Sequence, residues 1–343
     1  MANAMEGIKV FTPLQIDDLG ELKASVFEGL FTGGVGTLAT FFTSSDQSVQ
    51  EKQYFLNIHH EATSSTTSAV QFAISFGNIN GSGSTFTDDH KPGQSIYKKY
   101  ANLLLESTDS LFTFTSGSTT VDTDNIFVLN FKRNNIKDKI DAANWQLTLV
   151  SGSNTIKLVD DSAVASEQTN AVNRRFYNVV SGTLVSGQTD PTLHGSTYHY
   201  YGHVFPELGI LILNGNELSG SSKGVMSNAY ALDLTTGATI NNVNNFWKTI
   251  TSASFRSQEE LFSKYYFVRA KSKEYNFSSN PSYVTGSLGQ IVDNVADRGT
   301  PFSYVTGIGL YNNDGELLAV AKTSQPIFKE PGTEVNFKIR LDF

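Results

Sequence analysis

The chain has 343 residues, no cysteine and a formal net charge of −8. The missing cysteines exclude disulfides, cysteine nucleophiles and zinc–thiolate sites, and the scattered basic residues do not form the patch expected of a nucleic-acid-binding protein. Hydrophobic residues make up 39% of the chain and charged residues 17%, a composition that supplies a packed core and excludes global disorder.

The first 45 residues give no single secondary-structure signal. Residues 16–30 suit either a short helix or a pair of strands, and residues 31–42 mix small and apolar side chains that allow close packing of the backbone. From residue 53 the pattern favours strands. In residues 70–76, apolar side chains alternate with small or polar ones, which predicts a strand with one buried face.

The clearest helix signal lies in residues 94–107. Ile96, Tyr100, Leu103 and Leu104 recur at helical spacing after Pro92. A second helix is expected in residues 240–252, and a short helical start is expected at residue 259. The other apolar runs predict strands: 54–58, 111–114, 126–131, 145–150, 155–159, 176–180, 198–204, 209–214, 265–271, 305–311, 317–322 and 335–343.

Two turns indicate how neighbouring strands are joined. Asn313, Asp314 and Gly315 separate two apolar runs, which is a strong hairpin signal, and residues 151–154 form a similar polar connection. The pattern therefore predicts a mainly β (α+β) fold with antiparallel, sandwich-like sheets and two or three short helices. Composition shifts suggest three segments: a β-rich region with one helix (1–165), a β-rich middle (166–225) and a β-rich region with one or two helices (226–343).

Histidines and acids are the residues of this chain that could bind a metal or act in catalysis. His199 and His203 lie four apart in an expected strand, so their positions are about 13 Å apart and they cannot share one metal; surface or aromatic-stacked histidines are expected instead. His59 and His60 would face opposite sides of a strand, unlike the two histidines of a zinc peptidase. No helical stretch is apolar enough to cross a membrane.

Two acidic pairs occur in polar segments. Asp88–Asp89 and Asp160–Asp161 are expected to be exposed turn residues, because adjacent carboxylates diverge and cannot face each other across a sugar. The first residues lack a secretion signal, and the chain shows no nucleophile elbow, phosphate-binding loop or dinucleotide fingerprint. The sequence thus predicts no enzymatic activity, no cofactor and no metal site.

One aromatic cluster is a candidate contact site. Tyr198, His199, Tyr200 and Tyr201 could stack against a sugar or anchor a protein interface. The interface interpretation is favoured, and the glycan interpretation stays open.

Several strand-and-turn segments carry a resemblance to a known group of proteins. They cover roughly half of the chain: 95–105, 124–133, 201–215, 265–283, 304–311, 316–322 and 338–343. Together they resemble virion structural proteins of large contractile-tailed phages of marine bacteria and cyanobacteria. These motifs carry no catalytic signature, so the resemblance transfers no site residues.

The resemblance implies a structural subunit of a phage virion, in the tail at the baseplate or its wedges. Its expected partners are other tail and baseplate proteins and further copies of itself, with no nucleic acid and no membrane insertion. The chain would be made in the host cytoplasm and located in the virion. The alternatives are a receptor- or glycan-binding module on the tail, and a capsid decoration or neck protein.

Overall fold

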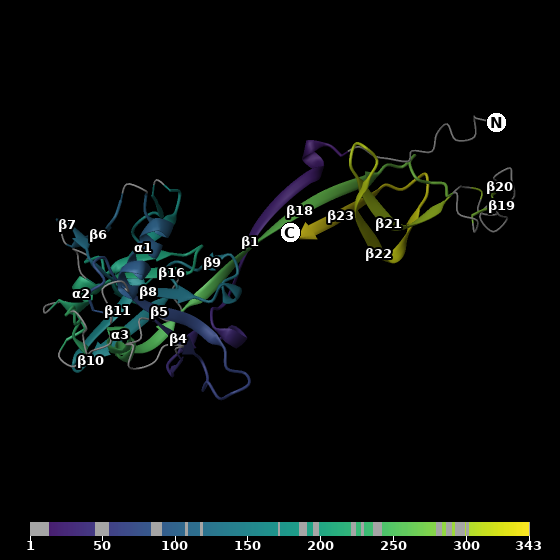
Figure 1. Cartoon of the computed structure of the whole chain (residues 1–343). Helices are drawn as coiled ribbons and strands as arrows, with labels where there is room; N and C mark the ends of the chain where they lie inside the picture. Colours follow the sequence, from purple (N-terminus) through teal and green to yellow (C-terminus); the bar gives the residue numbers. More distant parts are fainter. Residues whose placement is uncertain are drawn as a thin grey trace. The chain divides into compact units, whose positions relative to one another are not determined.

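The computed structural model describes residues 14–44, 55–83, 91–106, 109–116, 119–170, 172–184, 191–194, 199–220, 224–227, 230–235, 242–278, 283–285, 290–291, 299 and 302–342. The fold is mainly β and the sheets are antiparallel, which confirms the predicted class (Figure 1). Three α-helices occur in this part of the chain.

The largest sheet has 13 described strands and curls into a half-barrel. β12 (Gln168–Thr169) and β14 (Thr192–Leu193) pair with β13 beside the main path. The other strands follow one another in space: β2 (Thr37–Leu38), β17 (Ile250–Ser254), β10 (Gln146–Ser151), β11 (Asn154–Asp160), β13 (Arg175–Thr183), β15 (Gly202–Phe205), β16 (Ile210–Asn214), β8 (Asn125–Phe131), β5 (Val70–Asn78), β4 (Phe55–His59) and β3 (Phe42–Ser44).

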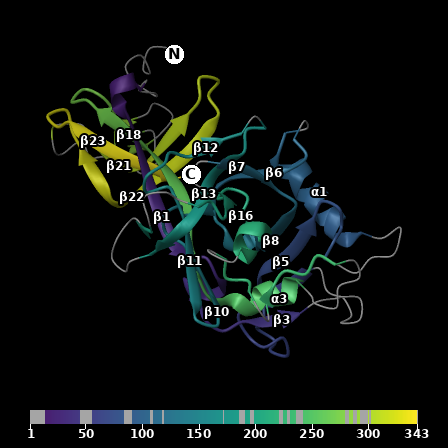
Figure 2. The same cartoon turned by 90° about the vertical axis from the view of Figure 1, so that its left-hand side faces the viewer.

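Three helices accompany this sheet: α1 (Pro92–Leu104), α2 (Gly215–Ser219) and α3 (Asn242–Thr249). α1 lies along β5, as Figure 2 shows, and it begins at the proline because the first turn of a helix tolerates a missing N–H. α3 ends earlier than expected because the chain enters β17 at Ile250. α2 was not expected from the sequence.

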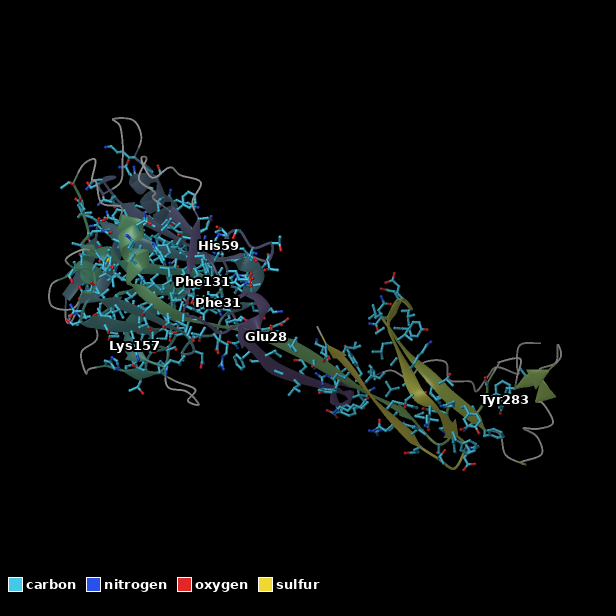
Figure 3. All side chains as sticks on the ribbon, turned by 90° about the horizontal axis from the view of Figure 1, so that it is seen from below. Glu28, Phe31, His59, Phe131, Lys157 and Tyr283 are labelled. Carbon is cyan, nitrogen blue, oxygen red and sulfur yellow. The ribbon has the colours of Figure 1, made fainter. Side chains whose placement is uncertain are left out.

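The curled sheet is packed on both faces. β8 shows how: Phe127, Leu129 and Phe131 belong to one buried apolar cluster, and Ile126 and Val128 belong to a second. The first cluster also holds Trp145 and Phe246, and the second is closed by α1 and by the hairpin of β6 (Phe112–Ser116) and β7 (Thr119–Thr123). Figure 3 shows Phe31 and Phe131 among the closely spaced side chains of this region.

The chain divides into two units, which we call the central unit (Ser25–Glu259) and the terminal unit (Met1–Ala24 with Glu260–Phe343). These bounds differ from the three expected segments. β13, β15 and β16 come from the middle segment, yet they continue the sheet between β11 and β8 of the first. Backbone pairing therefore joins residues that composition alone had separated.

The terminal unit contains two groups of strands. β1 (Leu19–Gly29), β18 (Arg256–Ala270) and β23 (Val335–Asp342) form a sheet in that order, in which β1 up to Ala24 and β18 from Glu260 belong to this unit. β9 (Lys139–Ile140) pairs with Ser257 and Gln258 of β18, which belong to the central unit. β21 (Ser303–Tyr311) and β22 (Leu317–Lys329) form the predicted hairpin, whose turn contains Gly315 at φ +81°. A further short pair joins β19 (Val284–Thr285) to β20 (Gln290–Ile291).

The long strands settle two ambiguous sequence signals. Residues 19–29 form one strand after a 3-10 turn, Ile16–Asp18, instead of a helix or a strand pair. The helical start expected at residue 259 is wrong, because β18 is extended from Arg256 onward. Pairing with β1, and with β9 at Ser257 and Gln258, imposes the extended conformation on a sequence whose glutamates suit a helix.

Candidate functional site

The described residues of the predicted aromatic cluster differ in how deeply they are buried. Tyr198 lies outside the described residues, and His199 and Tyr200 are half-buried. Tyr201 is only 5% exposed and belongs to the first apolar cluster. Its backbone N–H donates to the carbonyl of Val179, and its carbonyl accepts from the N–H of Asn214. Tyr201 is thus a core residue and does not contribute to an exposed stacking platform.

His199 is held next to helix α2. Its Nδ1 lies 3.2 Å from Oε1 of Glu217, and both side chains are 20% exposed. The side chain of Asn214 caps α2 by accepting from the backbone N–H groups of Asn216 and Glu217. Burial raises the pKa of Glu217, and burial together with the charge of Glu217 raises the pKa of Tyr201 to about 12. The contact between His199 and Glu217 holds α2 in place. It leaves one partly covered carboxyl group beside the cluster, that of Glu217.

His203 has a different environment from His199. Its ring lies 4.7 Å from that of Phe114 and 4.6 Å from that of Phe176. Desolvation of this partly buried ring lowers the pKa of His203 to about 3, so the ring is neutral at physiological pH. Of the two expected environments, surface or aromatic packing, His203 has the second, with its ring tilted against its neighbours. The described residues contain no group of three or more histidines and acids that could hold a metal ion.

His59 and His60 also have separate hydrogen-bond partners. His59 contacts the hydroxyls of Ser44 and Ser68 through its two ring nitrogens. His60 contacts the amide of Gln71 instead. The two rings serve separate local networks. The expected placement on opposite sides of one strand is wrong, because β4 ends at His59 and His60 lies just beyond it.

The acidic pair at residues 160 and 161 corrects a sequence prediction. Both side chains are buried, not exposed in a turn. Asp160 accepts from Trp145 Nε1 at 2.5 Å, from the N–H groups of Ala143 and Ser162, and from the Ser162 hydroxyl. Asp161 accepts from the backbone and side-chain amides of Asn178. Asp88 and Asp89 lie outside the described residues.

The buried acids are structural because donors surround them. Burial raises the pKa of Asp160 and of Asp161, and the hydrogen bonds that both carboxyls accept oppose this shift. Each carboxyl joins the end of β11 to a neighbouring segment. The signal missed in the sequence was the position of both aspartates directly after an apolar run. Where a chain leaves a buried strand, its N–H groups need acceptors, and these carboxyls supply them.

An amide network at one end of the sheet was also missed. Asn78 donates to Asn125, and Asn125 donates to Asn216, at 2.7 and 2.8 Å. Thr123 donates to Asn214 from the same end. These groups are largely buried and satisfy one another, so they fix strand ends. An asparagine at the boundary of each apolar run was the available signal.

A small cavity lies in the central unit beside Arg256. It has a volume of about 220 Å³ and is lined by glycines and by Asn144, Ser254 and Phe255. The guanidinium of Arg256 contacts Asp141 at 2.5 Å and lies 4.4 Å from the ring centre of Phe27. Arg256 is therefore engaged with this carboxylate and this ring.

The strands of the terminal unit expose many apolar side chains. None of its described residues belongs to either apolar cluster. Large apolar side chains are instead exposed on its strands: Leu19, Leu22, Phe262, Tyr304, Tyr311, Leu317, Leu318 and Val320. Exposed apolar side chains gathered on neighbouring strands are typical of surfaces that contact another molecule.

Comparisons with family models, with curated proteins and with solved structures find no match for this chain. None of the described helices has the length and apolar character needed to cross a lipid bilayer.

Proposed function

We propose that the chain is a structural subunit of a phage virion, incorporated into the tail at the baseplate or its wedges. The observation that carries this proposal is the terminal unit, whose strands expose apolar side chains and contribute nothing to the described core clusters. The resemblance of residues 265–283, 304–311 and 316–322 to virion structural proteins of contractile-tailed phages falls on this same unit.

The physical argument concerns the hairpin of β21 and β22. A two-stranded hairpin is marginally stable in water unless a further layer or strand covers it. Here Leu318 is 69% exposed and Val320 is 61% exposed. Contact with a neighbouring protein would remove this surface from water, and aromatic and apolar anchors are what such interfaces use. Assembly is thus the function that the exposed strands support best.

The receptor- or glycan-binding alternative depends on an exposed aromatic platform. Because Tyr201 is buried, at most His199 and Tyr200 of the described cluster could reach a ligand, and both are half-buried. A capsid decoration or neck protein would use the same exposed strands. Only the position in the particle separates that alternative from the tail.

Immunogold electron microscopy of intact particles tests the position. A polyclonal antibody raised against the whole chain would label the tail tip if the proposal is correct. Gold on the head or neck would contradict the tail placement, and absence from intact and partly disassembled particles would contradict the virion role. Antibody from a pre-immune serum serves as the control.

Amide hydrogen exchange tests the contact itself. In the free chain we expect β21 and β22 to exchange at least about a hundredfold faster than β8 and β16, which are buried on both faces. In the particle, β21 and β22 should become protected. Equal exchange of the hairpin in both states would contradict a role for this surface in assembly.

A further inference from the structure

One face of strands β3 and β4 in the central unit carries a group of side chains that the proposed function does not use. In this antiparallel pair, Ser44 lies opposite Asn57, and Phe42 lies opposite His59. Residues directly opposite each other, and residues two apart on one strand, point to the same face of a sheet. All four side chains therefore share one face, while the intervening residues of β4 are buried in the first apolar cluster.

Both ring nitrogens of His59, which is labelled in Figure 3, contact hydroxyl groups. Nε2 lies 2.9 Å from Oγ of Ser44, and Nδ1 lies 3.0 Å from Oγ of Ser68. Ser68 donates its own proton to the backbone carbonyl of Glu61 at 3.2 Å, so its oxygen accepts from Nδ1–H. This network assigns the ring proton to Nδ1, and the lone pair of Nε2 accepts from the hydroxyl of Ser44.

We propose that Ser44 is a nucleophile that takes an acyl group from a small ester, with His59 as its general base. A serine within hydrogen-bond reach of a histidine whose other nitrogen is held by a third group is the arrangement used in nucleophilic catalysis. The inference goes beyond the virion proposal and does not depend on it. The sequence did not predict this activity, because strand pairing and not a local motif brings the residues together.

The protonation state of His59 suits a base. Burial lowers the pKa of His59, and the charge of His60 lowers it further. The nearest acid in sequence is Glu61, whose carboxylate accepts from the hydroxyls of Ser65 and Thr67. A hydroxyl, that of Ser68, therefore orients the ring of His59 in place of the usual carboxylate, so we expect acylation to be slow.

Asn57 and Phe42 supply the two other contacts that an ester needs. Cβ atoms of directly opposite residues lie about 5 Å apart, so the Asn57 amide reaches a carbonyl oxygen attached at Ser44. This amide makes no hydrogen bond within the described part of the chain, and amide N–H groups stabilise the oxyanion of acyl transfer. The ring of Phe42 is 37% exposed and offers an apolar surface to the acyl chain.

The step needs no reactant besides the ester and water. Nε2 of His59 takes the proton of Ser44 while Oγ attacks the ester carbonyl and forms the new C–O bond. The bond to the leaving alcohol then breaks, and the alcohol takes the proton from Nε2. Attack by water in the same sequence releases the carboxylic acid and restores the hydroxyl of Ser44.

Labelling of the full chain with a fluorophosphonate tests the proposal, because this reagent phosphonylates activated serines and releases fluoride. We expect the label on Ser44 of the folded chain, mapped by tandem mass spectrometry, and no label on the chain unfolded in urea. His59→Gln should slow labelling at least about tenfold, since general-base catalysis contributes about 10²–10⁴-fold.

Ser181→Ala is the matched control. Oγ of Ser181 also lies near a histidine, 3.3 Å from Nδ1 of His194, but this contact is exposed. The variant should therefore be labelled like the wild type. No label on Ser44, equal labelling of the unfolded chain, or labelling that is insensitive to His59→Gln would overturn the proposal.

Hydrolysis of p-nitrophenyl acetate provides a second measurement. The wild type should release nitrophenolate in a burst equal to the protein concentration, and Ser44→Ala should remove the burst. The rate should rise with pH through a midpoint below the ordinary histidine pKa of about 6.5. Ser68→Ala should lower this midpoint further, because the cationic ring of His59 loses an acceptor. A burst retained in Ser44→Ala would overturn the assignment, and it would leave the virion proposal to gold labelling.

Discussion

The central and terminal units use their apolar residues in opposite ways. In the central unit, β8 and β16 are buried on both faces, and rings such as those of Phe127 and Phe246 stack 4.5 Å apart. In the terminal unit, β1 and the hairpin strands show mostly exposed side chains. The same chain thus contains one region that buries its apolar surface internally and one that presents it.

Polar contacts supply part of the stabilisation of the terminal unit, in which few apolar side chains are buried. Lys329 is buried and donates to the carbonyls of Ser272 and Glu330 and to the side chain of Asn276. Ser263 donates to Asp342 across paired strands. Such bonds fix local geometry, yet each contributes only about 1 kcal/mol net. The terminal unit therefore has a defined local geometry but little apolar stabilisation of its own.

Removing one phenylalanine from each unit should give the largest contrast. Phe127→Ala leaves a cavity between Phe76 and Phe246 and should lower the free energy of unfolding by about 3–5 kcal/mol. Phe262→Ala, at a position 50% exposed on β18, should lower it by less than about 1 kcal/mol. Urea unfolding followed by circular dichroism measures both.

A larger loss of stability in Phe262→Ala than in Phe127→Ala would contradict this contrast between the two units. It would mean that Phe262 is covered in solution by something within the same chain. An equal loss would contradict it too, because an exposed ring would then contribute as much to stability as a buried one.

A second contrast concerns buried and exposed aspartates. Asp160→Asn places an amide NH₂ where Trp145, Ala143 and Ser162 all donate, so we expect a loss of about 2–3 kcal/mol in the free energy of unfolding. Asp342→Asn keeps an acceptor oxygen for Ser263 and loses only the exposed ion pair with Arg340, so its effect should be much smaller. Near-ultraviolet circular dichroism should report the loss of Trp145 packing in Asp160→Asn alone.

Much of the fold was predictable because the apolar pattern is local. The strand at residues 70–76, the helix after Pro92 and the hairpin around Gly315 all follow from spacing or turn chemistry. The incorrect predictions concern segments whose conformation is set by tertiary contacts. β18 is extended from Arg256 because β1 and β9 pair with its first half, although its glutamates suit a helix.

The candidate sites were less predictable for the same reason. Tyr201 and Tyr200 are adjacent and chemically alike, but only the position of β13 and β16 decides that Tyr201 is buried. Asp160 and Asp161 resemble turn acids in sequence, and only the fold brings Trp145 and Asn178 to them. The exposure of the strands in the terminal unit could not be predicted either, because their alternation of apolar and polar residues resembles that of any half-buried strand.

Lys329 offers a smaller test within the terminal unit. Lys329→Met keeps the length of the side chain but leaves three acceptors unpaired, which should cost about 1–2 kcal/mol locally. Amides of residues 272–276 should then exchange about tenfold faster. Lys322→Met, at an exposed position of β22, is the matched control and should change nothing. Unchanged exchange in Lys329→Met would show that apolar contacts, not this lysine, hold the segment.

The smallest expected effect is a difference in the sign of pH dependence between the units. Burial raises the pKa of Asp161, so its contribution to stability is present below the ordinary aspartate pKa of about 4 and is lost as pH rises through the folded value. Hydrogen bonds from Ser263 and Arg340 lower the pKa of Asp342, whose contribution is present above the ordinary value and lost as pH falls through the folded one. Carboxyl titration by NMR should place the midpoint of Asp161 above that of Asp342. The reverse order would show that donors, not burial, dominate in the central unit.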